Sequence, residues 1–199
     1  MIFPALSLEL RPLLAELEEF GRTNDAAEDD RALKMLNLDR ASAELVHFLL
    51  ISTCRKRILE IGTSNGYSTL WLAAAARANH GRPVVSVERD PAKIAHAREN
   101  LKRAGLSDWV ELVESDATAA AASVTGPFDA VFFDADRLSA PEQLTLLLPK
   151  LADDVLLMHD NAKSHADQLV AYRAAVEALP GIVATTVPVG KGLHLAHRR

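Results

Sequence analysis

The sequence has almost no cysteine, and this scarcity excludes an internal disulfide as a source of stability. Cys54 is the only cysteine among the 199 residues. A chain without disulfides is typical of reducing compartments, so we expect a cytoplasmic protein. Cys54 follows an apolar run, and this placement favours a side chain packed in the core over a reactive nucleophile.

Long apolar runs are missing as well. A helix that spans a bilayer needs about 20 consecutive apolar residues, and no stretch of the sequence approaches that length. The first residues, Met1 to Ala5, lack both the positive charges and the apolar block of a secretory signal. We therefore expect a soluble protein without a membrane partner.

Positive charge is the minority sign, with 22 lysines and arginines against 27 acidic residues and a formal net charge of −5. This balance disfavours a nucleic-acid partner, although a local basic patch stays compatible with it. The length favours one domain with a substantial core. We predict a single domain over 1–199, with a helical extension over 1–32 and the core over 33–199.

The most informative segment covers residues 57–73. Ile58 to Ile61 have the character of a short buried strand, 62–66 form a turn punctuated by glycines, and an alanine-rich helix begins near Ser68. Glycine allows a sharp turn and a close approach of the backbone to a ligand. The N–H groups at the start of the helix then face the same crevice. This segment predicts a site for a nucleotide-type cofactor.

Strands and helices alternate along the rest of the chain. This alternation predicts an α/β fold with a doubly wound, mostly parallel seven-stranded sheet, whose C-terminal hairpin alone is antiparallel. A turn is expected over 151–155 and a last helix over 165–179. The other predicted strands are 84–87, 109–113, 128–133 and 155–158, with the hairpin over 182–197. Predicted helix caps are Asp39 or Ser42, Asp90, and Ser139 with Glu142 in a capping box.

Leucines recur at helical spacing over residues 5–21 and predict an amphipathic helix, broken near Pro12. Its apolar face is expected to pack on the main domain, or instead to form a dimer surface or a lid over substrate. The polar stretch 23–31 is predicted to be a loop.

Polar residues stand where several predicted strands end. Parallel strands bring their carboxyl ends to one edge of the sheet, where ligands bind. Glu88 closes the strand after the glycine turn, a position from which a carboxylate accepts hydrogen bonds from ribose hydroxyls. Asp116 follows the next strand and either binds an adenine amino group or caps a helix. The residues at strand ends are 62–68, Glu88, Asp116, Asp134, Asp160 and Asn161.

The glycine turn departs from the dinucleotide fingerprint Gly-x-Gly-x-x-Gly. Ser64 occupies the middle glycine position and Tyr67 the last. A pyrophosphate is poorly accommodated without these glycines. S-adenosylmethionine, which has a nucleoside but no phosphate, fits the turn better.

Several short segments, taken together, resemble the cation-dependent, catechol O-methyltransferase-like family. The resemblance covers about residues 33–197 and implies a Rossmann-like class I methyltransferase fold, with 33–199 as a catalytic core that binds S-adenosylmethionine. The segments are Glu60-Ile-Gly-Thr-Ser-Asn-Gly-Tyr-Ser68, Val87-Glu88, Ser115-Asp116-Ala117, Asp134-Ala-Asp-Arg137 and Asp160-Asn161.

The resemblance implies roles for individual residues. Met35 lies in a segment, 35–37, that would close over cofactor and substrate. The methionine end of the cofactor would contact Glu60, Gly62, Ser64, Gly66 and Ser68, the ribose Glu88, and the adenine Ser115, Asp116 and Ala117. Asp134, Asp160 and Asn161 would hold a metal ion. Oxygen donors of this kind suit Mg²⁺ or Ca²⁺, which would bind two vicinal hydroxyls of the acceptor and lower the pKa of one.

Arg137 departs from the family pattern. Many members have a lysine at this position, where it takes the hydroxyl proton. A guanidinium stays protonated and is a poor general base, but it can stabilise a phenolate or bind an acidic group of the substrate. His159, His165 and Asp136 are alternative bases.

The sequence therefore predicts methyl transfer from S-adenosylmethionine to a hydroxyl of a small catechol-like molecule, assisted by Mg²⁺, in a homodimer. Asp134 and Arg137 are the predicted catalytic residues. One alternative acceptor is a hydroxylated uridine in transfer RNA. A second alternative is a cofactor-binding protein that has lost catalysis.

Overall fold

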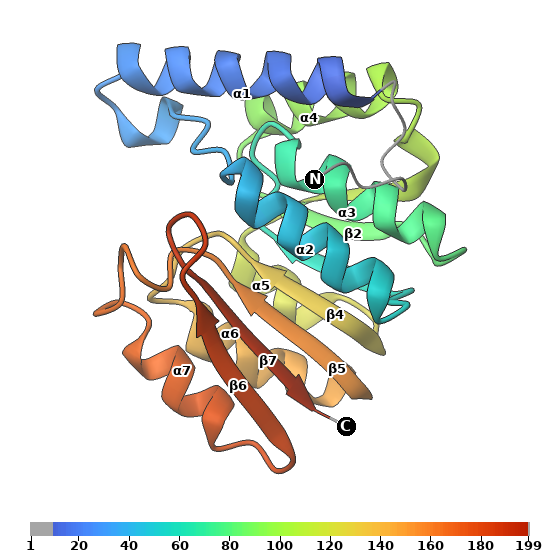
Figure 1. Ribbon diagram of the computed structural model, residues 1–199, viewed down its shortest axis with the longest axis vertical. Coiled ribbons are helices and arrows are strands. Elements are labelled where there is room, and N and C mark those ends of the chain that lie inside the picture. The colour runs from blue at the N-terminus through green and yellow to red at the C-terminus, as the bar shows by residue number, and fades with distance from the viewer. Residues whose placement is uncertain (1–9, 199) are drawn as a thin grey trace.

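The computed structural model describes residues 10–198 (Figure 1). Its strands are β1 Ile58–Ile61, β2 Val84–Glu88, β3 Val110–Glu114, β4 Phe128–Phe133, β5 Leu151–His159, β6 Ile182–Val187 and β7 Leu193–Arg198. They form one sheet in the order β3-β2-β1-β4-β5-β7-β6. Strands β1 to β5 run parallel, and β7 is antiparallel to β5 and β6. The predicted fold class is confirmed.

Helices cover both faces of the sheet (Figure 1). The α-helices are α1 Leu10–Ala27, α2 Arg40–Ser52, α3 Tyr67–Ala78, α4 Pro91–Arg103, α5 Ala117–Ser123, α6 Ala140–Leu147 and α7 Val170–Glu177. Short 3₁₀ turns are η1 Arg31–Leu33, η2 Ser107–Trp109 and η3 Leu148–Lys150. Between residues 10 and 198, no helix combines the length and the apolar character that crossing a bilayer requires.

The central strands are buried on both faces, because side chains alternate along a strand. Ile58 and Phe132 belong to the core cluster that also contains residues of α1 to α4. Their neighbours Leu59 and Phe133 belong to the cluster on the opposite face, with residues of α5, α6 and α7. The two core clusters therefore fix the carboxyl edge of the sheet. The glycine turn and the polar residues at the strand ends lie at this edge.

Two predicted helix caps are confirmed and one is wrong. The Asp39 carboxylate accepts a hydrogen bond from the N–H of Ser42 at the start of α2, and Asp90 caps α4. The Ser139 side chain makes no capping hydrogen bond. Its hydroxyl instead donates to Asp136, 2.6 Å away, because the turn that precedes α6 brings this carboxylate closer than the helix N–H groups.

The N-terminal prediction is partly wrong. α1 continues past Pro12 and through the first part of the polar stretch, ending at Ala27. Residues 5–9 of the predicted helix lie outside the described residues. Leu13, Leu14 and Leu17 are buried in the core cluster shared with α2 and α3. The apolar face of α1 therefore packs within the chain. The polar end of the helix is tied to the segment that follows, since the Asn24 side chain donates to the carbonyl oxygen of Leu33 at 3.0 Å.

Three other predictions are wrong for local reasons. Cys54 is exposed, since it occupies a tight turn after α2 with φ at +54°. Residues 151–155 extend β5 and do not form a turn, because Leu151 pairs with Phe128 across an irregularity in the ladder. The last helix is limited to Val170–Glu177. Residues 162–169 form turns instead, and the N–H groups of 162–164 donate to the carbonyl oxygens of Lys191 and Gly192 in the β6–β7 connection.

Candidate active site

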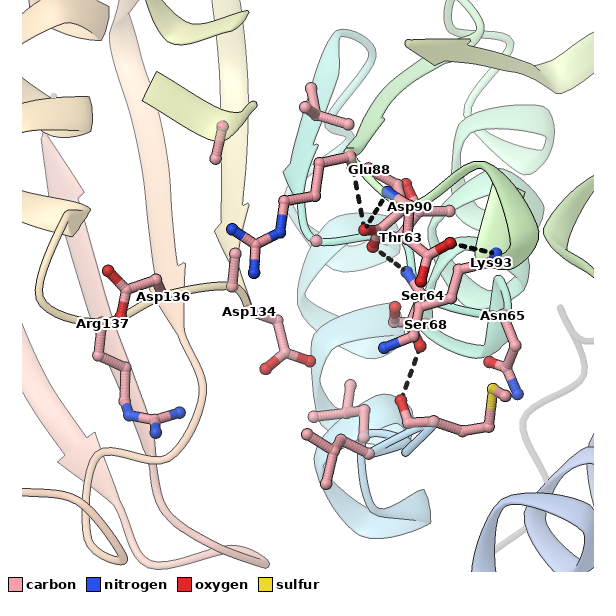
Figure 2. A pocket seen from close by; sticks show the side chains of 18 of the residues that line it. Thr63, Ser64, Asn65, Ser68, Glu88, Asp90, Lys93, Asp134, Asp136 and Arg137 are labelled. Carbon is pink, nitrogen blue, oxygen red and sulfur yellow. Dashed lines mark hydrogen bonds between the residues drawn. The ribbon is translucent and has the colours of Figure 1, made fainter. Parts of the chain in front are cut away.

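A cavity of about 580 Å³ lies at the carboxyl edge of β1, β2 and β4 (Figure 2). Its wall combines the segment before α2, the glycine turn, the ends of β2 to β4 and the β6–β7 turn. Most of the predicted site residues line it: Met35, Gly62, Ser64, Ser68, Glu88, Ser115, Asp116, Ala117, Asp134, Arg137 and Asn161. Glu60, Gly66 and Asp160 are not among the lining residues.

The two glycines of the turn have different roles. Gly62 has φ of +107°, and a Cβ there would lie 2.6 Å from the carbonyl oxygen of Asp134. Glycine at 62 thus lets the ends of β1 and β4 approach each other beneath the cavity. Gly66 precedes α3 with φ of +86°, and its Cβ would meet Ala97 of α4 at 3.1 Å. It serves helix packing behind the cavity wall.

Glu60 is fully buried behind the cavity and does not face it. Its carboxylate accepts hydrogen bonds from the hydroxyls of Ser68, Thr69 and Ser86, each 2.6 Å long. Burial raises the pKa of this carboxyl above its usual value despite these hydrogen bonds. Glu60 therefore orients Ser68, which does line the cavity.

Glu88 is fixed by backbone N–H groups at the opposite wall. Its carboxylate accepts from the N–H of Ser64 at 2.9 Å, of Arg89 at 2.9 Å and of Asp90 at 3.0 Å. Figure 2 shows Glu88 beside the glycine turn. A carboxylate has about four acceptor positions, so one remains for a ribose hydroxyl.

The predicted helix cap at Asp116 is confirmed, and the role of this residue at the adenine stays a prediction. Its carboxylate accepts from the N–H of Thr118 and of Ala119, at 2.9 and 3.1 Å, and so caps α5. The residue also lines the cavity, next to Ser115 and Ala117. The cap fixes the carboxylate at the end of β3, where a purine amino group would meet it.

The segment before α2 is tied down over the cavity from three sides. The Ser64 hydroxyl donates to the carbonyl oxygen of Met35 at 2.7 Å. The Lys93 ammonium donates to the carbonyl oxygen of Lys34 at 2.8 Å. Asp25, at the end of α1, accepts from the N–H of Met35. Sequence reasoning missed Asp25 and Lys93, since neither lies near the other groups in the chain.

The side chains of Asp134, Asp160 and Asn161 converge, as their positions at the ends of neighbouring strands led us to expect. The Asn161 amide nitrogen lies 2.6 Å from Asp160 Oδ2 and 3.5 Å from Asp134 Oδ1. Burial raises the pKa of Asp160 to about 6. Burial and then the charge of Asp160 raise the pKa of Asp134 well above its usual value. The two carboxylates therefore share a poorly solvated space that favours a positive charge between them.

The donor set fits a divalent cation. The Asp160 Oδ1 atom is buried and has no hydrogen-bond partner among the described residues. Carboxylate and amide oxygens are the ligands that Mg²⁺ and Ca²⁺ prefer. No cluster of three His, Cys, Asp or Glu side chains occurs within residues 10–198, so a metal here needs the Asn161 amide, turned to present its oxygen.

The residues considered as bases differ in access to the cavity. His159 is buried away from it, with Nδ1 2.8 Å from the carbonyl oxygen of Asp160. His165 and Asp136 both line the cavity. The Asp136 carboxylate accepts from Ser139, and this hydrogen bond lowers its pKa. Arg137 also lines the cavity, and its Nε donates to the Gln168 side chain at 2.8 Å.

The fold and the cavity together define a class. S-adenosylmethionine-dependent methyltransferases have this arrangement. It combines a doubly wound sheet, a carboxylate at the end of β2, a glycine turn without the dinucleotide glycines, and polar residues at the end of a third strand. The methyltransferase domain family matches residues 59–162 of this chain.

Known proteins extend this match. A catechol O-methyltransferase of Mycobacterium tuberculosis is 32% identical over 174 residues, covering 81% of this chain and 78% of its own. The cofactor-bound structure of Rv0187 from MTB superposes with a TM-score of 0.78 at 31% identity, covering 94% of this chain and 90% of that one. The O-methyltransferase TomG from Streptomyces achromogenes, in complex with S-adenosylmethionine, has a TM-score of 0.77 at 25% identity, with coverages of 97% and 90%.

The chain belongs to the catechol O-methyltransferase-like branch of the methyltransferase family. It is an O-methyltransferase that uses S-adenosylmethionine.

Proposed function

We propose that this enzyme methylates a hydroxyl of a small catechol-like molecule with the help of a divalent cation. The observation that carries the proposal is the pair of adjacent carboxylates, Asp134 and Asp160, with Asp160 Oδ1 buried and unpartnered. Two carboxylates in a poorly solvated space are unfavourable unless a cation or a proton joins them. Asp134, Asp160 and Asn161 would hold that cation.

The cation, when bound, lowers the pKa of an acceptor hydroxyl and orients it. Ser64 and Ser68 would contact the methionine part of the cofactor, Glu88 the ribose and Asp116 the adenine. Met35 and its neighbours would cover both ligands and exclude water. Arg137 stays protonated, so it would stabilise negative charge on the acceptor and would not take the proton. Positioning of the hydroxyl in line with the methyl group supplies much of the acceleration.

Methyl transfer from labelled S-adenosylmethionine to caffeate, with Mg²⁺ and again with EDTA, tests the proposal. We expect turnover with Mg²⁺ and its loss in EDTA. The Asp160→Asn variant removes one charge at constant size and should lose the Mg²⁺ dependence of both turnover and thermal unfolding. Asp153→Asn, at an exposed position of β5, is the control. Turnover that is indifferent to EDTA would exclude the metal role of the three residues.

The two alternatives from the sequence can be tested in the same assay. Transfer RNA that carries hydroxyuridine, used as the acceptor, tests the hydroxyuridine alternative. The names of the catechol O-methyltransferase relatives do not support this alternative. Absence of turnover with every acceptor, despite cofactor binding, would favour a protein that has lost catalysis.

The homodimer and the cytoplasmic location also stay proposals. The apolar face of α1 that suggested a dimer is buried within the chain, while Phe20 on the same helix is 42% exposed. Light scattering of the purified protein would decide the oligomeric state, and fractionation of the source cells the location.

A further inference from the structure

Five cationic residues line the cavity. Arg89 and Lys93 follow Glu88 in the chain, on the side of the predicted ribose contact, and the other three come from other segments. Arg31 belongs to η1, Arg137 to the connection between β4 and α6, and Lys191 to the turn between β6 and β7. We call them the acceptor-side cations. The fold brings them together from three distant parts of the chain.

Electrostatic effects show that the acceptor-side cations share one region. The pKa of His165, which also lines the cavity, is lowered by burial first and then by all three of them. Arg137 and Lys191 also oppose the rise in pKa of both Asp134 and Asp160. All three cations therefore lie in the part of the cavity wall near His165, and Arg137 and Lys191 also lie near the two carboxylates.

None of the acceptor-side cations takes part in an ion pair within residues 10–198. The hydrogen-bond partner of Arg137 is the neutral Gln168. Asp136 is adjacent in sequence, but its carboxylate accepts from Ser139. Figure 2 shows the Asp136 carboxylate and the Arg137 guanidinium pointing in different directions.

The local charges do not balance. One divalent ion would neutralise Asp134 and Asp160 together, and the carboxylate of Asp136, which also lines the cavity, would offset one of the three cations. Two positive charges would then remain at this end of the cavity. The sulfonium of the cofactor adds a further positive charge. An uncharged acceptor leaves this excess uncompensated, while an anionic one is attracted to it.

We propose that Arg31, Arg137 and Lys191 bind a carboxylate of the acceptor, so that the preferred substrates are hydroxylated aromatic acids. This proposal rests on the proposed function. A guanidinium offers two parallel N–H donors that match a carboxylate, which a lysine ammonium does not. Arginine in place of the family lysine at 137 thus has a recognition role. Three converging cations suit one anionic group, whereas a nucleic-acid backbone requires an extended basic stripe.

The test compares 3,4-dihydroxybenzoate with 3,4-dihydroxybenzamide, which has the same size and hydroxyls but no charge. Calorimetry on the protein loaded with S-adenosylhomocysteine measures affinity, and labelled methyl transfer measures kcat and KM. We expect the benzoate to bind about tenfold more tightly, as for a charge-assisted hydrogen-bonded pair. The difference should appear in KM.

Arg137→Gln and Lys191→Gln should remove most of this preference, because they weaken the binding of benzoate much more than the binding of benzamide. Lys163→Gln is the matched control, because Lys163 lies beside the same turn but does not line this cavity. Cofactor affinity should be equal in all variants.

Equal affinity of wild-type protein for the two acceptors would overturn the proposal even if methyl transfer occurs. A loss of S-adenosylhomocysteine affinity in the variants would overturn it too, by assigning the cations to the cofactor, and so would a preference for transfer RNA over the benzoate. Failure of this proposal can be distinguished from failure of the proposed function, because the calorimetric comparison of the two acceptors does not require turnover.

Discussion

The carboxylate of Asp25 accepts a hydrogen bond from the backbone N–H of Met35, 2.7 Å away. Its second oxygen accepts from the N–H of Leu36 at 2.9 Å. The end of α1 thereby anchors the segment that lies over the cofactor cavity, although Asp25 itself does not line that cavity. The N-terminal extension thus contributes to the site through backbone hydrogen bonds.

Asp25→Ala should weaken S-adenosylhomocysteine binding about tenfold, because two charge-assisted hydrogen bonds to the covering segment are lost. Calorimetric titration measures the dissociation constant. Asp29→Ala, which removes an exposed carboxylate nearby, is the control and should bind like the wild type. Unchanged affinity in Asp25→Ala would show that the segment does not depend on this anchor.

Gly62→Ala should cost about 3 kcal/mol of unfolding free energy or more, since it combines a left-handed φ with a close contact to the Asp134 carbonyl oxygen. Gly105→Ala provides a matched comparison: φ is +63°, but nothing lies within 4 Å of the added Cβ. It should cost about 1 kcal/mol and leave cofactor affinity intact. Urea denaturation measures the unfolding free energy of both variants. Equal losses of unfolding free energy in the two variants would refute the role of the close contact at Gly62.

Acid should destabilise the fold through His159. Burial lowers the pKa of His159 to about 4, so the folded state favours the neutral ring, and its contribution is complete above the ordinary histidine pKa of about 6.5. As pH falls from there toward 4, the unfolded state binds the proton first, and up to about 3 kcal/mol is lost.

His159→Phe keeps an aromatic ring beside Phe133 and Tyr172 and removes this titration. The variant should lose less stability than the wild type between pH 6.5 and pH 4, as followed by urea unfolding at each pH. Parallel stability curves for the two proteins would contradict the assignment.

Arg55→Met should destabilise the protein by about 2–4 kcal/mol without changing cofactor affinity. Arg55 is only 3% exposed, and its guanidinium donates to the carbonyl oxygens of Asp129 and Asp154 at the amino edge of the sheet. Lys56→Met, at an exposed neighbour, is the control for thermal unfolding. Near-identical melting of both variants would refute a structural role for Arg55.

The sequence by itself determined the order of strands and helices and most of the cavity wall. Alternating apolar strands and helices admit few topologies besides a doubly wound sheet, and such a sheet gathers its strand ends at one edge. Asp134 and Asn161 could therefore be predicted to converge, since they follow two buried strands, β4 and β5, that are neighbours in the sheet.

Contacts between distant segments were decided by the tertiary structure alone. The polar end of α1 is tied to the segment before α2, since Asn24 donates to the carbonyl oxygen of Leu33 and Asp25 accepts from the N–H of Met35. No local pattern encodes these contacts. Glu60 and Gly66 carry the sequence marks of cofactor contacts, yet the structure turns them toward hydroxyls and a helix behind the wall. The acceptor-side cations come from the 3₁₀ turn η1 and from two loops. Such segments have no periodicity from which the proximity of these side chains could be derived.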